Sequence, residues 1–176
     1  MASPSTKSPT VGADSNLVGT LKWSYPTSIY VSDNTRASTP RNSTGTTHYL
    51  KATDFGFAIP AGATIDGILV EVETWGTAAG DVESEVRLVK ADGSIGGTNK
   101  ATGAQIPTTE TYVSYGGVSD LWGESWDADK INDADFGVVI SDVVGTGGRI
   151  YVDHIRISVY YTAAATGNPH YYYAQL

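Results

Sequence analysis

The chain has 176 residues, no cysteine and a formal net charge of −8 at pH 7. This length is typical of one domain, and the lack of thiols excludes disulfides and thiolate metal sites. The negative charge argues against nucleic acid as a partner, and we expect neither a signal peptide nor a membrane-spanning segment because no apolar run is long enough.

Residues 1–16 are the first predicted segment, a stretch rich in Ser, Thr, Pro and Gly. Such a composition buries too little apolar surface to fold alone. The segment is therefore predicted to be an extended N-terminal arm, either disordered or ordered against a neighbouring subunit. The folded domain is expected to span residues 17–162.

Short runs of β-branched and aromatic residues alternate with turn signals from residue 17 onward, which is typical of a sandwich or barrel. In the clearest run, residues 65–75, Ile68, Val70 and Val72 share one face, as in a half-buried strand. The pattern predicts an all-β antiparallel sandwich or jelly roll of about eight strands with one short helical turn. The other expected strands are residues 18–23, 28–31, 47–57, 84–90, 111–116, 136–141 and 150–162.

The strand expected at residues 150–162 carries a carboxylate among apolar side chains. Asp153 falls on the face predicted to line the core, and a carboxylate buried there must be paired or hydrogen-bonded. We expect it to accept backbone or hydroxyl hydrogen bonds near one end of the sandwich, with metal ligation or a part in a site as the alternative. The face predicted to line the core also carries Tyr151, Ile155, Ile157, Val159 and Tyr161.

One helical turn is predicted at residues 126–131, where Asp127 can cap the free amides. Several nearby acids raise the alternative of a calcium site. An EF-hand loop requires an oxygen ligand and then a glycine where this chain has Ile131 and Asn132, so capping with solvated acids is favoured over an irregular calcium site. The weak calcium candidates are Asp127, Asp129, Asp133 and Asp135.

Catalytic motifs are not found in the sequence. His48, His154 and His170 are far apart and follow no zinc-binding spacing, and no nucleophile elbow or phosphate-binding loop is present. We therefore predict no enzyme activity, no catalytic residue and no cofactor.

The aromatic residues are mostly rings with a polar group, with 4 Trp and 11 Tyr against 3 Phe. Trp122 and Trp126 are interpreted first as closing one end of the core, and alternatively as rings that stack on a sugar. The tail, residues 163–176, is too aromatic for a free solvated end, so we expect it to dock on its own domain or on a neighbour.

Seven segments carry a resemblance to a known family: YLKATDFGF (49–57), IPAGATIDGI (59–68), VRLVK (86–90), YVSYGG (112–117), DLWG (120–123), INDADFGV (131–138) and VDHIRISVYY (152–161). Together and in this order they resemble a β-sandwich domain found in structural proteins of tailed bacteriophages and prophages. The resemblance implies a capsid decoration (cement) or head-fibre subunit on the outer capsid surface of the virion, assembled in the host cytoplasm. Its implied partners are the major capsid protein and copies of itself, for example as a trimer.

Two other functions remain open at this point. The first is a glycan-binding module of a tail fibre or another receptor-binding apparatus, which would use Trp122 and Trp126. The second is a subunit of an extracellular filament. For any assembly, the expected interface residues are Val11, Leu17, His170, Tyr171, Tyr172, Tyr173 and Leu176.

Overall fold

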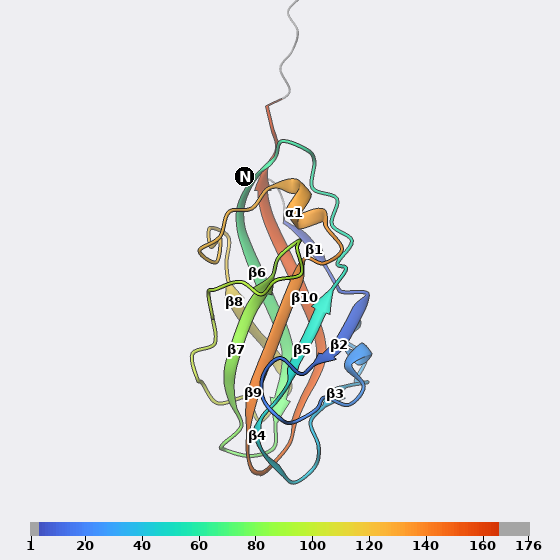
Figure 1. The fold of residues 1–176 in the computed structure, drawn as a ribbon, viewed down its shortest axis with the longest axis vertical. Helices are drawn as coiled ribbons and strands as arrows, with labels where there is room; N and C mark the ends of the chain where they lie inside the picture. Colours follow the sequence, from blue (N-terminus) through green and yellow to red (C-terminus); the bar gives the residue numbers. More distant parts are fainter. Residues whose placement is uncertain (1–3, 166–176) are drawn as a thin grey trace, which may run out of the picture.

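The structure, a computed structural model, describes residues 4–165. They form two antiparallel sheets of five strands each, packed face to face (Figure 1). The predicted all-β sandwich is confirmed, with ten strands in the described part of the chain. No helix within these residues has the length and apolar character needed to cross a membrane.

The first sheet is built around two long neighbouring strands, β6 and β10. Its order is β1, β10, β6, β8, and the short β3 also pairs with β10. Its strands are β1 (Ser5–Lys7), β3 (Ala37–Ser38), β6 (Thr64–Gly76), β8 (Thr111–Gly116) and β10 (Ile150–Thr162).

The second sheet is built around β9, which pairs with β7 and with both β4 and β5. The terminal strand β2 pairs with β5. After β9 the chain passes to β10 in the first sheet through the single residue Arg149. The strands of this sheet are β2 (Val11–Ser15), β4 (Ser43–Thr46), β5 (Tyr49–Thr53), β7 (Val82–Val89) and β9 (Gly137–Gly148).

The core lies between the sheets and follows the period of two of their strands. Ile68, Val70 and Val72 of β6 are buried in it, as their alternation predicts. The second sheet contributes Val138 and Ile140 from β9 to the same cluster. Burial of these apolar faces is the main stabilising contribution to the fold.

A β-bulge at Asp153 changes which face of β10 lines the core. The pairing of β10 with β6 shifts register between Val152 and His154, so the side-chain alternation changes phase there. The prediction that Tyr151 faces the core is therefore wrong. Its ring stacks on Trp75 of the neighbouring strand, with ring centroids 4.5 Å apart and 9° between the planes. The buried apolar residues of β10 are Ile150 and Val152 before the bulge and Ile155, Ile157 and Val159 after it.

The sandwich begins earlier than the predicted boundary at residue 17. Residues 5–7 and 11–15 are the strands β1 and β2, and each belongs to one of the two sheets. Polar contacts reinforce this pairing, because Thr6 Oγ1 lies 2.6 Å from Ser158 Oγ. Composition missed these strands because polar residues at a sheet edge are held through backbone hydrogen bonds. Of the predicted tail, only residues 163–165 are described.

Two predicted strands near the start of the domain are wrong. Residues 18–23 make a single isolated bridge, between Leu21 and Thr47, and residues 28–31 overlap a 3₁₀ turn, η1 (Pro26–Ile29). Pro26 at the start of η1 has the fixed φ of a helical turn, and Tyr25 before it is left-handed with φ 55°. The predicted helical turn is confirmed as α1 (Ala128–Asn132), which Asp127 caps by accepting the Lys130 N–H at 2.9 Å.

Candidate functional site

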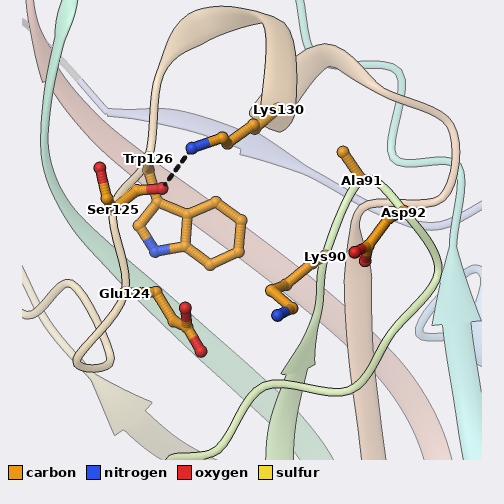
Figure 2. A pocket seen from close by; sticks show the side chains of 7 residues that line it. All are labelled: Lys90, Ala91, Asp92, Glu124, Ser125, Trp126 and Lys130. Atoms are coloured by element: carbon orange, nitrogen blue, oxygen red, sulfur yellow. Dashed lines mark hydrogen bonds between the residues drawn. The ribbon is translucent and has the colours of Figure 1, made fainter.

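A pocket of about 350 Å³ lies beside α1 (Figure 2). The helix α1 lies at one end of the sandwich (Figure 1). Two separate segments form the pocket. One is the chain that follows β7, and the other is the loop that leads into α1, together with one residue of α1. The lining residues are Lys90, Ala91, Asp92, Glu124, Ser125, Trp126 and Lys130.

Trp126 is the aromatic side chain of the pocket. Its ring meets Phe136 edge to face, with centroids 5.3 Å apart and 75° between the planes. Its indole N–H donates to the carbonyl oxygen of Leu121 at 3.0 Å. These two contacts fix the orientation of the ring. Figure 2 shows its six-membered ring directed into the space between Lys90 and Lys130.

Charged groups of both signs surround the indole. Lys130 Nζ donates to the Ser125 carbonyl at 2.9 Å, which holds the ammonium at the rim (Figure 2). Asp92 accepts hydrogen bonds from the N–H and hydroxyl of Ser94, and these bonds lower the pKa of Asp92. The rim therefore offers an ionised acceptor and ammonium donors around an aromatic ring.

Glu124 supplies the second carboxylate of the rim. Its Oε1 atom lies 3.4 Å from the backbone nitrogen of Gly97, a long hydrogen bond that connects the loop after β7 with the loop before α1. No other hydrogen bond to this carboxylate is found in residues 4–165, so its remaining acceptor positions are open to the pocket or to solvent. Glu124 can therefore accept hydrogen bonds from a ligand.

The structure separates the two tryptophans that the sequence grouped as glycan candidates. Trp122 is 1% exposed, and its indole N–H donates to the Ile68 carbonyl at 2.9 Å. Lys100 Nζ lies 5.7 Å from the centre of its ring. Trp122 is thus a core residue that cannot reach a ligand, whereas Trp126 lines the pocket.

The weak calcium candidates are not brought together around a cation site. Asp127 is the α1 cap, and Asp133 Oδ1 accepts the backbone N–H of Asp135 at 2.9 Å. Asp129 lies in the first turn of α1. Within residues 4–165 no group of three or more His, Cys, Asp or Glu side chains is arranged to hold a metal ion.

Asp153 is buried as predicted, and one of its oxygens has the expected backbone partner. Oδ2 accepts the Asn34 N–H at 3.1 Å, while the buried Oδ1 has no hydrogen-bond partner. Burial raises the pKa of this carboxyl group. Asp153 is buried because it lies at the bulge where β10 shifts register against β6, so the pairing of these strands explains its position.

The described histidines lie at separate places, each with its own partners. His154 is held between Ser8 Oγ and Tyr112 OH, both at 2.8 Å. His48 Nδ1 lies 3.0 Å from Asp14 Oδ2. Neither histidine lines the Trp126 pocket.

Of the expected interface residues, Val11 and Leu17 are exposed, at 45% and 72%. The tail candidates lie outside the described residues. These are His170, Tyr171, Tyr172, Tyr173 and Leu176.

Sequence reasoning missed most of the pocket. In the sequence, Lys90 is the last residue of a predicted strand and Asp92 belongs to a predicted turn. Neither Glu124 nor Lys130 is part of a recognisable binding motif. Only the tryptophan gave a signal. The others become site residues because the fold places the end of β7 beside α1.

Comparisons with known proteins add one structural similarity. No family model matches the chain, and no curated protein matches it. A solved structure, the CBM22-1 xylan-binding domain of Xyn10C from Paenibacillus barcinonensis, is similar over 90% of this chain and 94% of that one. The TM-score is 0.45 and the sequence identity 8%. The resemblance to phage proteins stays a prediction.

Proposed function

We propose that this chain is a non-catalytic carbohydrate-binding module whose binding site is the Trp126 pocket. The supporting observation is a half-buried indole, oriented by Phe136 and Leu121, in a pocket rimmed by charged side chains of both signs. An indole face matches the apolar C–H face of a pyranose ring. Carboxylates and ammonium groups around it can bond the sugar hydroxyls.

The size and charge of the pocket favour a neutral sugar. Its volume of about 350 Å³ is in the range of roughly 300–1,000 Å³ that is typical of small-molecule sites. Two lysines, Lys90 and Lys130, and two carboxylates, Asp92 and Glu124, line the pocket, so its lining carries no formal excess of either sign. Lys130 Nζ also lies 3.5 Å from Asp127 Oδ2 beside the pocket. Such a rim supplies donors and acceptors for hydroxyl groups without selecting a charged ligand.

Asp92 is suited to accept hydrogen bonds from a sugar and not to act as a general acid. Glycoside hydrolysis needs one carboxyl group with a raised pKa to protonate the leaving oxygen. The Ser94 hydroxyl and N–H lower the pKa of Asp92, so this group stays ionised and serves as an acceptor.

The test is a screen of the intact chain on an array of neutral and acidic glycans, followed by calorimetry on the glycans that bind. We expect Trp126→Ala to weaken binding at least tenfold, Trp126→Phe to weaken it less, and Glu124→Gln to weaken it by loss of a charged acceptor. Near-ultraviolet circular dichroism checks that each variant is folded.

Tyr25→Ala is the matched control, because Tyr25 is an exposed aromatic residue beside η1 and outside the pocket. Its affinity for the same glycans should equal that of the wild type. Equal affinities for Trp126→Ala and the wild type would contradict the proposal. So would the failure of every glycan on the array to bind.

A second candidate function is a structural subunit, as the resemblance to phage proteins implies. The observation in its favour is that Val11, Leu17, Tyr25 and Val31 are exposed large apolar side chains around the terminal strand β2 and η1. A terminal strand can pair with another chain through its backbone. Under this proposal the partners are copies of the chain and a major capsid protein on the outer surface of a virion.

Self-association tests this second candidate. Sedimentation of the intact chain over a range of concentrations should show an oligomer, and Leu17→Ser combined with Val31→Ser should shift it toward monomer. A chain that stays monomeric at every concentration would count against assembly through this surface.

A further inference from the structure

A second pocket, of about 160 Å³, lies where the chain crosses from β9 to β10. In Figure 1, α1 is at one end of the long axis and this crossover is at the other. The pocket is therefore far from the Trp126 site. Its lining residues are Arg41, Asn42, Thr77, Gly147, Gly148, Arg149 and Tyr151.

The pocket contains two arginines that lack an acidic partner. Elsewhere in the structure Arg36, Arg87 and Arg156 each pair with a glutamate, at 2.6 to 2.9 Å. Arg41 and Arg149 form no ion pair with any carboxylate of residues 4–165, although acidic residues outnumber basic ones 19 to 11 in the chain. Both of them line this one pocket.

Arg149 is held rigidly in place. Its Nε donates to the Thr39 carbonyl at 2.9 Å, and its Nη2 donates to Ser38 Oγ at 2.7 Å. The guanidinium also lies 4.8 Å from the centre of the Tyr151 ring, a cation–π contact. Its Nη1 has no hydrogen-bond partner among the described residues. A fixed guanidinium with a free N–H group loses little entropy when it binds an anion.

The walls around Arg149 are also fixed. Tyr151 is stacked on Trp75, which prevents the ring from turning away. On the other side, the fully buried Asp81 accepts the Thr77 N–H and the Gly145 N–H, each at 2.9 Å. The carboxylate of Asp81 thus joins the loop after β6 to the end of β9 and is bonded to backbone amides.

We propose that this pocket binds an oxyanion, a carboxylate or phosphate group carried by a small polar ligand, between the guanidinium groups of Arg41 and Arg149. Two like charges that line one small pocket repel each other until an anion lies between them. Guanidinium groups match carboxylate and phosphate oxygens in geometry. The amide of Asn42 and the hydroxyl of Thr77 supply further hydrogen bonds from the pocket lining.

This inference does not depend on the carbohydrate proposal, because no residue lines both pockets. Nuclear magnetic resonance of the ¹⁵N-labelled intact chain tests it, with sodium glucuronate, inorganic phosphate and glucose titrated at constant ionic strength. Glucuronate or phosphate should shift the signals of Arg149, Gly147 and Tyr151 in a saturable way, and glucose should not. Whichever anion saturates at lower concentration identifies the preferred group.

The variants are Arg41→Gln and Arg149→Lys, with Lys22→Gln as the matched control. Arg41 is exposed and makes no hydrogen bond among the described residues, so its removal leaves the fold intact. Each pocket variant should bind the anion at least tenfold more weakly, whereas the control, an exposed cation elsewhere, should bind like the wild type. Equal affinities for Arg41→Gln and Lys22→Gln would overturn the proposal, as would the absence of shifts at the pocket with both anions.

Discussion

Asp142 of β9 lies directly opposite Glu83 of β7, and both carboxyl groups are buried. Glu83 Oε1 accepts the hydroxyl of Tyr115 at 2.9 Å, and Asp142 lines a very small internal cavity with Tyr115. Burial, together with the nearby charges of Glu83 and Asp81, raises the pKa of Asp142 to about 8. Asp142 is therefore protonated at neutral pH, and the core of the sandwich contains a neutral carboxylic acid.

This buried acid predicts that the protein loses stability as the pH rises. The folded state holds the Asp142 proton up to about pH 8, whereas the unfolded chain releases it near its ordinary pKa of 3.8. The stabilising contribution is complete below the unfolded pKa and is lost as the pH rises toward the folded pKa. Within this window the free energy of unfolding should fall by up to about 1.4 kcal/mol per pH unit.

Urea unfolding of the wild type and Asp142→Asn at several pH values between 4 and 9 measures this effect. The variant should show a smaller decline, and comparing the two cancels the contributions of the other titrating groups. Asp129→Asn, at an exposed acid in α1, should keep the slope of the wild type. Identical slopes for Asp142→Asn and the wild type would show that Asp142 is already ionised at low pH.

The two tryptophans near α1 should contribute differently, Trp122 mainly to stability and Trp126 mainly to binding. Trp122 is buried with its N–H bonded to Ile68, so Trp122→Ala should cost about 3–5 kcal/mol of unfolding free energy. Trp126 is only partly buried, and Trp126→Ala should cost about 1–2 kcal/mol and leave the chain folded. Urea unfolding of both variants measures the difference. A larger loss for Trp126→Ala would mean that this ring is mainly a core residue.

The local parts of the fold could be predicted from the sequence. Ile68, Val70 and Val72 follow the period of a half-buried strand, and this pattern needs no knowledge of distant residues. The cap at Asp127 is equally local, because the side chain bonds an amide three residues further along. Such features depend on neighbours in the chain, so the sequence shows them directly.

Features that depend on pairing between distant segments could not be predicted. Asp153 reverses the alternation of β10 because that strand shifts register against β6, and nothing local marks the shift. The candidate site has the same limitation. Trp126 and Lys90 line one pocket only because α1 lies beside the end of β7, and the fold likewise brings Arg41 and Arg149 to another pocket.

Two roles of Asp127, capping of α1 and calcium binding, can be distinguished by substitution. Asp127 Oδ1 accepts the Lys130 N–H at 2.9 Å, and this bond lowers the pKa of Asp127. Asp127→Ala should therefore cost about 1 kcal/mol, whereas Asp127→Ser should cost much less because a serine oxygen can make the same bond. Thermal unfolding with calcium or with a chelator should give equal midpoints for the wild type. A midpoint that rises with calcium and no longer does so in Asp127→Ser would support the calcium alternative.

Gly116, the last residue of β8, predicts a large effect from the smallest substitution. Its φ of 80° lies in the left-handed region, which strains any residue with a Cβ atom. A Cβ here would also lie 2.6 Å from Trp122 Nε1 and collide with the Ile68 carbonyl, the two groups that bond to each other. Because backbone and indole are both fixed in the core, neither can move aside cheaply.

Gly116→Ala should thus lower the free energy of unfolding by more than the roughly 1–2 kcal/mol expected from the left-handed backbone alone. Gly97→Ala is the control, because a Cβ at that position meets no atom within 4 Å and its φ is not positive. Urea unfolding monitored by tryptophan fluorescence should show a clear loss for the first variant and little change for the second. Equal stability of the two variants would mean that the Trp122 indole can give up its hydrogen bond to the Ile68 carbonyl at no cost in free energy. The indole would then not be held in a fixed position in the core.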